Sequence, residues 1–302
     1  SAGDDTITVG AGDQVIGGAG GDDVIKVSDA LLSGSLSVDG GAANSSDTLQ
    51  VTSDATVIDN DFAQVTSIEL LQLTADAADD AQSIILGSLA EAGGLVAIDT
   101  TGAGADDQVT IDASAFTAAL NINTGGAADH IVLGAGGSVV NAGGGDNTLT
   151  IGAANDGIEN DDITTGSGDD YVLTTDAQLT ANLGISAGGG TDTLEVSSDA
   201  SVVDADLAGL GNVERLLLGA NAGDDAQSVT LAGNAAAAGI NTVAVVDSAL
   251  ADAITLDASG FNNALTVNTG AGNDLITLGS GGSVVDAQGG DNVITVGAAN
   301  DG

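Results

Sequence analysis

Side chains that offer oxygen ligands recur in this chain at a fixed spacing. Steps of nine residues (138 − 129, 147 − 138 and 156 − 147) separate Asp129, Ser138, Asn147 and Asp156. Glycine-rich segments surround each of these positions, and an apolar residue follows two places later. The same spacing recurs at Asp274, Ser283, Asn292 and Asp301, and again at Asp5, Gln14 and Asp23. Carboxylates and amides repeated at turns indicate a row of cation ligands rather than a catalytic centre.

The elements that must hold these side chains are short. A nine-residue unit has room for one strand and one turn, and its repetition in phase predicts a solenoid. Two units complete a coil, so residues 18 apart, such as Asp129 and Asn147 (147 − 129), fall on the same edge. Parallel strands lie about 4.8 Å apart. Neighbouring loops therefore bring carbonyl and carboxylate oxygens to one point, as calcium requires.

The sequence also repeats with a longer period than nine residues. Asp47-Thr48-Leu49 matches Asp192-Thr193-Leu194, and GAANDG at 152–157 matches 297–302, both 145 residues apart (192 − 47 and 297 − 152). We expect two tandem repeats of about 145 residues that form one continuous rod, 1–157 and 158–302, with 290–302 beginning a third copy.

Each long repeat contains two kinds of sequence, one rich in β-branched residues and one rich in Gly and Asp. Residues 47–122 and 192–267 hold β-branched runs such as TLQV, IELLQL and QVTI, which predict strands. The segments with short Gly/Asp spacing predict small coils. Helix is expected only as single turns at 59–65 and 204–210, and the Ala-rich segment 231–240 is the best helical alternative. The predicted fold class is an all-β parallel β-helix or β-roll solenoid built from nonapeptide coils.

Composition narrows the classes of partner. Lys26 and Arg215 are the only basic residues against 44 acidic ones, so the formal net charge is −42. Such a chain repels itself unless cations neutralise it. Nucleic-acid binding is excluded because phosphate contacts need basic side chains. We also expect no direct membrane insertion, because no run of about 18 apolar residues occurs. No secretion signal lies in this window, and without cysteine no disulfide forms.

The nonapeptides resemble a known family. GGAGGDDVI at 17–25 fits the G-G-x-G-x-D-x-U-x pattern of the RTX calcium-binding repeats at every specified place. TGSGDDYVL at 165–173 and TGAGNDLIT at 269–277 depart only at the first glycine, whereas Ser138, Ser283 and Gln14 replace the aspartate. The chain is similar to the repeat regions of bacterial surface-layer proteins and giant secreted adhesins. The match covers about a third of the sequence.

The resemblance implies parallel β-roll geometry, several bound Ca²⁺ ions, folding that waits for extracellular calcium, and type I secretion. Transferred position by position, it implies a ligand set of Asp5, Asp22, Asp23, Asp129, Asn147, Asp170, Asp274 and Asn292. Asp156 and Asp301 are second choices. The alternative is that these Gly-Asp pairs are turns without metal, because Asp and Asn favour such turns on their own.

We therefore expect a non-enzymatic extracellular structural module at the bacterial cell surface. It would be a segment of a surface layer, an adhesin spacer or a matrix filament that stiffens on binding calcium and self-associates into sheets or filaments. One alternative is a calcium-dependent folding appendage of a larger secreted enzyme. Another is an adhesin region that binds cell-surface glycan or ice. The sequence has no catalytic pattern such as H-E-x-x-H or G-x-S-x-G.

Overall fold

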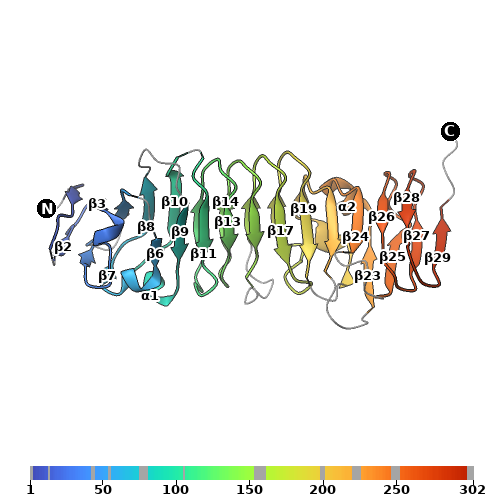
Figure 1. Ribbon diagram of the computed structural model, residues 1–302, viewed down its shortest axis with the longest axis horizontal. Helices are drawn as coiled ribbons and strands as arrows, with labels where there is room; N and C mark the ends of the chain where they lie inside the picture. The colour runs from blue at the N-terminus through green and yellow to red at the C-terminus, as the bar shows by residue number, and fades with distance from the viewer. Residues whose placement is uncertain are drawn as a thin grey trace. The chain divides into compact units, whose positions relative to one another are not determined.

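The computed structural model describes residues 3–12, 14–41, 45–53, 56–74, 81–104, 106–152, 161–197, 201–219, 226–245 and 252–297. Strands make up 41% of the structure. Contacts divide the chain into two compact units, Ser1–Asn155 and Asp156–Gly302. Every strand pairing in the described residues is parallel, which confirms the predicted all-β parallel solenoid (Figure 1).

Unit 1 is built from three parallel sheets. The first contains β1 (Thr6–Thr8), β3 (Val24–Val27), β5 (Thr48–Val51), β8 (Leu70–Thr74), β10 (Ala97–Gly102), β12 (Asn121–Asn123) and β14 (Val139–Asn141). The second contains β6 (Thr56–Ile58), β9 (Gln82–Ile85), β11 (Val109–Asp112), β13 (His130–Val132) and β15 (Thr148–Thr150). The third contains β2 (Val15–Gly17), β4 (Ser37–Asp39) and β7 (Val65–Thr66).

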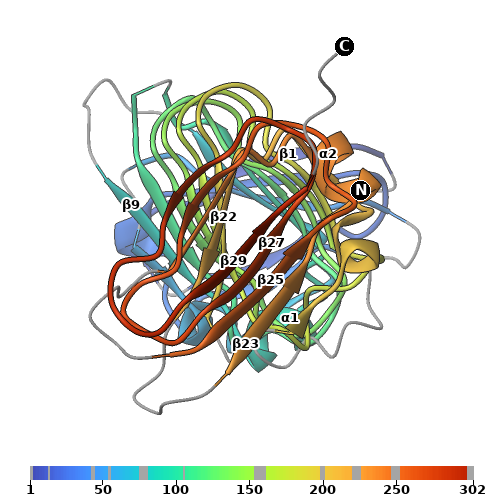
Figure 2. The same ribbon diagram turned by 90° about the vertical axis from the view of Figure 1, so that its right-hand side faces the viewer.

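Unit 2 repeats this plan. One sheet contains β16 (Asp162–Thr164), β18 (Gly184–Ser186) and β21 (Leu210–Gly211). A second contains β17 (Tyr171–Thr174), β19 (Thr193–Val196), β22 (Arg215–Leu218), β24 (Thr242–Val245), β26 (Thr266–Asn268) and β28 (Val284–Asp286). The third contains β20 (Ser201–Val202), β23 (Gln227–Thr230), β25 (Ile254–Ala258), β27 (Leu275–Leu278) and β29 (Val293–Val296). Figure 2 shows β25, β27 and β29 side by side.

The core is a stack of aliphatic side chains, because most of the short strands point one or two apolar residues inward. In the first sheet of unit 1 these residues pair in register and are all buried: Ile25, Leu49, Leu71, Ile98, Ile122 and Val140. In unit 2 the corresponding stack begins with Val172, Leu194, Leu216, Val243 and Val267. Phe116 and Phe261 are also fully buried. Identical spacing of inward residues fixes the register, because a one-residue slip would turn this whole row outward.

Coil length varies more than the nine-residue spacing predicts. The 18-residue step joins Asp5 to Asp23 and Asp129 to Asn147, but 24 residues join Asp23 to Asp47. A step of 27 residues joins Gln72 to Asp99. The additional residues form the corners and short helices of the larger coils, so the inward stack continues unbroken.

The short helices lie close to the predicted positions. The 3-10 helices η2 (Asp59–Phe62) and η3 (Asp204–Leu207) occupy the two expected single turns, and α2 (Gly233–Ala238) occupies the Ala-rich segment. The structure adds η1 (Asp29–Leu31) and α1 (Ser88–Ala92). Asp59 accepts hydrogen bonds from the backbone N–H of Gly87 (2.8 Å) and Ala90 (2.9 Å) at the start of α1. The acidic turn of one coil therefore holds the helix of the next.

Candidate metal centre

The glycine-rich corners share one backbone pattern. In five described turns, residues four and two positions before a buried or half-buried Asp or Asn have positive φ. These triplets are Ala19/Gly21/Asp23, Gly143/Gly145/Asn147, Gly166/Gly168/Asp170, Gly188/Gly190/Asp192 and Gln288/Gly290/Asn292. Positive φ suits glycine because it lacks a Cβ atom. This alternation explains the glycine spacing in the sequence more directly than a general need for flexibility does.

The turns of successive coils lie in direct backbone contact. A Cβ atom on Gly143 would lie 1.8 Å from the carbonyl oxygen of Gly125, and one on Gly188 would lie 1.9 Å from that of Gly166. By contrast, a Cβ atom on Gly189, which lies between Gly188 and Gly190, would have no other atom within 4 Å. At Gly143 and Gly188, backbone conformation and close approach together favour glycine, whereas Ala19 and Gln288 occupy positive-φ positions in two other turns.

Buried and half-buried Asp, Asn and Glu residues form a ladder of hydrogen bonds along the inside of the corners, which we call the inner ladder. Each backbone N–H donates to the side chain of the corresponding residue one coil further on. Asp5 donates to Asp23 Oδ1 (2.7 Å), and Asp23 donates to Asp47 Oδ1 (2.8 Å). The remaining steps join Asp47 to Glu69, Asp129 to Asn147, Asp170 to Asp192, Asp192 to Glu214 and Asp274 to Asn292.

A second, outer ladder runs in the opposite direction. Here the N–H of the later coil donates to the side chain of the earlier one, as Asp22 does to Asp4 (2.9 Å) and Ser46 does to Asp22 (2.8 Å). Thr191 donates to Asp169 and Asp291 donates to Asn273 in the same way. These side chains lie on the solvent side, and Asp22 is exposed whereas the adjacent Asp23 is fully buried.

Several inner-ladder carboxylates keep one buried oxygen without a hydrogen-bond donor. This holds for Oδ2 of Asp23, Asp129 and Asp192. Glycine allows the carboxylate to lie against its own turn, since a Cβ atom on Gly18 would lie 2.1 Å from Asp23 Oδ2. A buried carboxylate oxygen without a donor costs free energy unless a proton or a cation satisfies it.

The electrostatics of two rungs follow from this burial. Burial, together with the nearby carboxylates of Asp170, Glu214 and Asp169, raises the pKa of Asp192 to about 6, although the hydrogen bond with the Asp170 N–H lowers it. Burial also raises the pKa of Asp129, although the hydrogen bond from the Val109 N–H opposes the rise. The Thr124 proton is donated to the Ala142 carbonyl (3.0 Å), so Asp129 Oδ2 stays without a donor.

The donor chemistry of the inner ladder fits a hard cation, but the carboxylates alone do not form a chelate. Among the described residues, no group of three or more His, Cys, Asp and Glu side chains could hold a metal ion. Calcium takes six to eight oxygens, and backbone carbonyls contribute commonly. Asp23, Asp129 and Asp192 would hold calcium through their free oxygens, and turn carbonyls would supply the rest.

The predicted site residues divide into three groups. Asp5, Asp23, Asp129, Asn147, Asp170, Asp274 and Asn292 lie in the inner ladder. Asp22, which holds the consensus aspartate position in the complete motif match at 17–25, lies in the outer ladder instead. Asp156 and Asp301 lie outside the described residues.

Sequence reasoning missed four inner-ladder members: Asp47, Glu69, Asp192 and Glu214. Their coils are 22 or 24 residues long, so they fall off the nine-residue spacing. The signal that could have found Asp47 and Asp192 is the repeated Asp-Thr-Leu that they begin, whose Leu49 and Leu194 lie in the inward stack.

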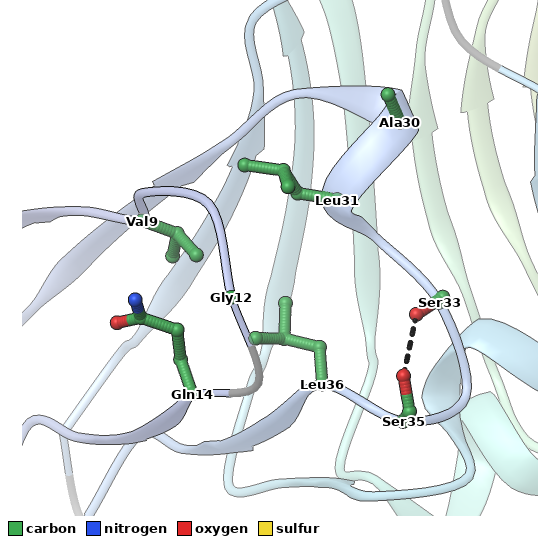
Figure 3. Close-up of a pocket in the computed structure, with 8 residues that line it drawn as sticks. All are labelled: Val9, Gly12, Gln14, Ala30, Leu31, Ser33, Ser35 and Leu36. Atoms are coloured by element: carbon green, nitrogen blue, oxygen red, sulfur yellow. Dashed lines mark hydrogen bonds between the residues drawn. The ribbon is translucent and has the colours of Figure 1, made fainter.

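A cavity and a half-buried tyrosine contact lie outside the ladders. A cavity of about 190 Å³ lies between the first turns of unit 1 (Figure 3). None of its lining residues is titratable: Val9, Gly12, Gln14, Ala30, Leu31, Ser33, Ser35 and Leu36. In unit 2, the Tyr171 hydroxyl donates a hydrogen bond to Glu195. Burial and then this carboxylate raise the pKa of Tyr171.

Comparison with known proteins adds no family. No family model, curated protein or solved structure matches the chain. In the described part of the chain, no helix is long and apolar enough to span a membrane.

Proposed function

We propose that this chain is a non-enzymatic, calcium-binding structural module of an extracellular surface layer, adhesin spacer or matrix filament. The observation that carries the proposal is the buried carboxylate oxygen without a donor, repeated at Asp23, Asp129 and Asp192. Each lies at a glycine corner in contact with the neighbouring coil. A divalent cation shared by such corners would satisfy these oxygens.

The charge of the chain supports the same function. With a net charge of −42 and two basic residues, the stacked coils bring carboxylates together without enough internal cations. Ca²⁺ binding to the folded coils, and not to the unfolded chain, adds stability by mass action, about 2.7 kcal/mol when free calcium is 100 times the Kd. The module would stay loose where calcium is scarce and stiffen where calcium is abundant, which is why we place it outside the cell.

Calcium titration followed by circular dichroism and thermal melting tests the proposal. We expect the β-sheet signal and the melting temperature to rise with Ca²⁺ relative to EGTA, with a smaller response to Mg²⁺, which prefers fewer ligands and retains its water. Identical melts in calcium and chelator would contradict calcium-coupled folding.

A matched pair of variants locates the effect. Asp23→Asn keeps the acceptor for the Asp5 N–H but removes the buried charge, so the calcium-induced rise in melting temperature should shrink. Asp39→Asn is the control, because it removes the same charge from an exposed position on β4. If both variants lose the same part of the response, bulk charge screening rather than corner binding explains it.

A further inference from the structure

A row of polar side chains crosses five strands on the outward face of the first sheet of unit 1. Its members pair in register from β5 to β14: Gln50, Gln72, Asp99, Asn123 and Asn141. Gln50 Nε2 donates to Gln72 (2.6 Å), Gln72 Nε2 donates to Asp99 (3.3 Å), and Asn141 Nδ2 donates to Asn123 (3.0 Å). These contacts hold the side chains in place before any ligand arrives, which lowers the entropic cost of binding.

A groove lies along this row. It has a volume of about 460 Å³ and is lined by Asp99, Asn123 and Asn141 together with Asn121, Leu70, Ala97 and Val139. The small Ala97 pairs with Leu70 on β8 and Asn121 on β12, so the surface is hollowed between two larger side chains. Val139 is 50% exposed, and Asn121 is exposed. The groove thus offers hydrogen-bonding groups beside an aliphatic wall, the combination that small-ligand sites use.

The charge of the groove restricts its ligand. None of the lining residues is basic, and the chain carries a net charge of −42, so acidic sugars and phosphates are repelled. Asp99 is the only lining carboxylate. Its Oδ1 accepts from Thr101 and its Oδ2 from Gln72, so both oxygens already accept hydrogen bonds from neighbouring residues. The ligand class that best suits this lining is therefore a neutral molecule whose hydroxyl groups can hydrogen-bond to Asp99, Asn123 and Asn141.

The other repeat changes this polar row at two of its five positions. Residues 145 positions later are Leu217 in place of Gln72 (217 − 72) and Ala244 in place of Asp99 (244 − 99). They occupy the same register on β22 and β24. The remaining equivalents, Glu195, Asn268 and Asp286, are polar, so Gln72 and Asp99 are the positions that distinguish the two rows.

We propose that the groove over β8, β10, β12 and β14 binds a linear neutral glycan. The chain of sugars would cross the strands, with hydroxyl groups on the Asp99, Asn123 and Asn141 side and C–H faces against Leu70, Ala97 and Val139. Polar side chains repeat at the strand separation, about 4.8 Å, so a regular polymer meets similar contacts on each strand. With no aromatic ring in the groove, we expect a single site to bind weakly.

Affinity electrophoresis of the full chain in calcium buffer tests this proposal. The probes are a neutral β-1,4-glucan, dextran, polygalacturonate as the acidic polymer and chitosan oligomers as the cationic one. We expect retardation by at least one neutral glucan and none by polygalacturonate. The double variant Q72L/D99A installs residues that the second repeat uses at these positions, and it should weaken binding about tenfold. Asn268→Ala, on β26 of unit 2, is the control and should leave binding unchanged.

Three outcomes would overturn the proposal. They are no retardation by any neutral glucan, equal retardation of the double variant, and retention by chitosan alone. Sedimentation of the same variants measures self-association and so tests whether a second copy of the chain occupies the groove. If Q72L/D99A abolishes self-association and leaves glucan binding intact, the face belongs to a second copy of the chain. An unchanged melting temperature of the double variant in calcium separates loss of the glycan site from loss of calcium-dependent folding.

Discussion

The inner ladder contains two kinds of step, and the contrast between them isolates the role of charge. At Asp23/Asp47 and Asp170/Asp192 a carboxylate accepts the backbone N–H of another aspartate, at 2.8 Å in both cases. At Asp129/Asn147 and Asp274/Asn292 an amide oxygen accepts it, at 2.9 and 2.8 Å. The hydrogen bond has the same length with either acceptor. The negative charge at Asp47 and Asp192 is therefore not needed to satisfy the backbone.

This equivalence separates two contributions to stability. The backbone hydrogen bond belongs to the fold and persists without metal, whereas the carboxylate adds a desolvation cost that a cation would offset. Steps with an amide should be stable in chelator, and steps with two carboxylates should respond most to calcium. Replacing an amide by a carboxylate in one step, and a carboxylate by an amide in another, tests this directly. Substitution of a turn glycine should give the largest loss of stability.

The largest effect should come from Gly188→Ala. Gly188 has a φ of 90°, and an added Cβ atom would overlap the carbonyl oxygen of Gly166. Left-handed backbone and steric overlap together should lower the free energy of unfolding by about 3 kcal/mol, in calcium and in chelator. Urea unfolding measures this loss. Gly189→Ala is the control, since a Cβ atom there meets nothing within 4 Å. Equal losses from both variants would show that turn stacking is not what limits this corner.

A smaller effect is expected when an amide step becomes a carboxylate step. Asn147→Asp places a second buried carboxylate beside Asp129 and removes the amide hydrogen bond to the Gly145 carbonyl (3.0 Å). In chelator the unfolding free energy should fall by about 2 kcal/mol. In saturating calcium the variant should recover most of that loss, because it gains a ligand. Equal destabilisation with and without calcium would mean that no cation reaches this corner.

The reverse exchange should have the smallest effect and the opposite sign. Asp192→Asn keeps an acceptor for the Asp170 N–H and removes a buried charge, so at neutral pH in chelator we expect a gain of about 1 kcal/mol. The pKa of Asp192 is raised from 3.8 to about 6, so the folded state holds this proton more tightly than the unfolded state. The wild-type stabilisation from the proton is full below about pH 4 and is lost as pH rises to about 6.

Urea unfolding between pH 4 and pH 7 in chelator measures this dependence. The stability difference between Asp192→Asn and the wild type should grow over that interval and stay constant above it. A difference that does not change with pH would show that the pKa of Asp192 is the same in the folded and unfolded states.

The sequence predicted the fold class and the short coils because their signals are local. A strand of three or four residues, a glycine turn and an inward apolar residue repeat within nine positions, as at Asp129 and Ile131. The ladder members Asp47 and Asp192 were missed because their position depends on coil length. That length is set by helices and corners inserted between strands, and only the three-dimensional register shows which residues then align.

The distinction between Asp22 and Asp23 also required the structure. Both fit a Gly-Asp turn, and a motif fitted one position early assigns the ligand to Asp22. The inward direction of Ile25 places Asp23 inside, two residues before it on the same side of the strand. The outer ladder was not predicted at all, because its backbone donors carry no sequence signature.

The hydrogen bond between Tyr171 and Glu195 has a practical consequence. The chain has one tyrosine and no tryptophan, so its intrinsic fluorescence arises from a single place, on β17 beside the Asp170 corner. Unfolding of unit 2 separates that phenol from its carboxylate partner and changes the emission. The molecule thus carries a built-in optical reporter for one repeat, and the stability of unit 2 can be followed without attaching a dye.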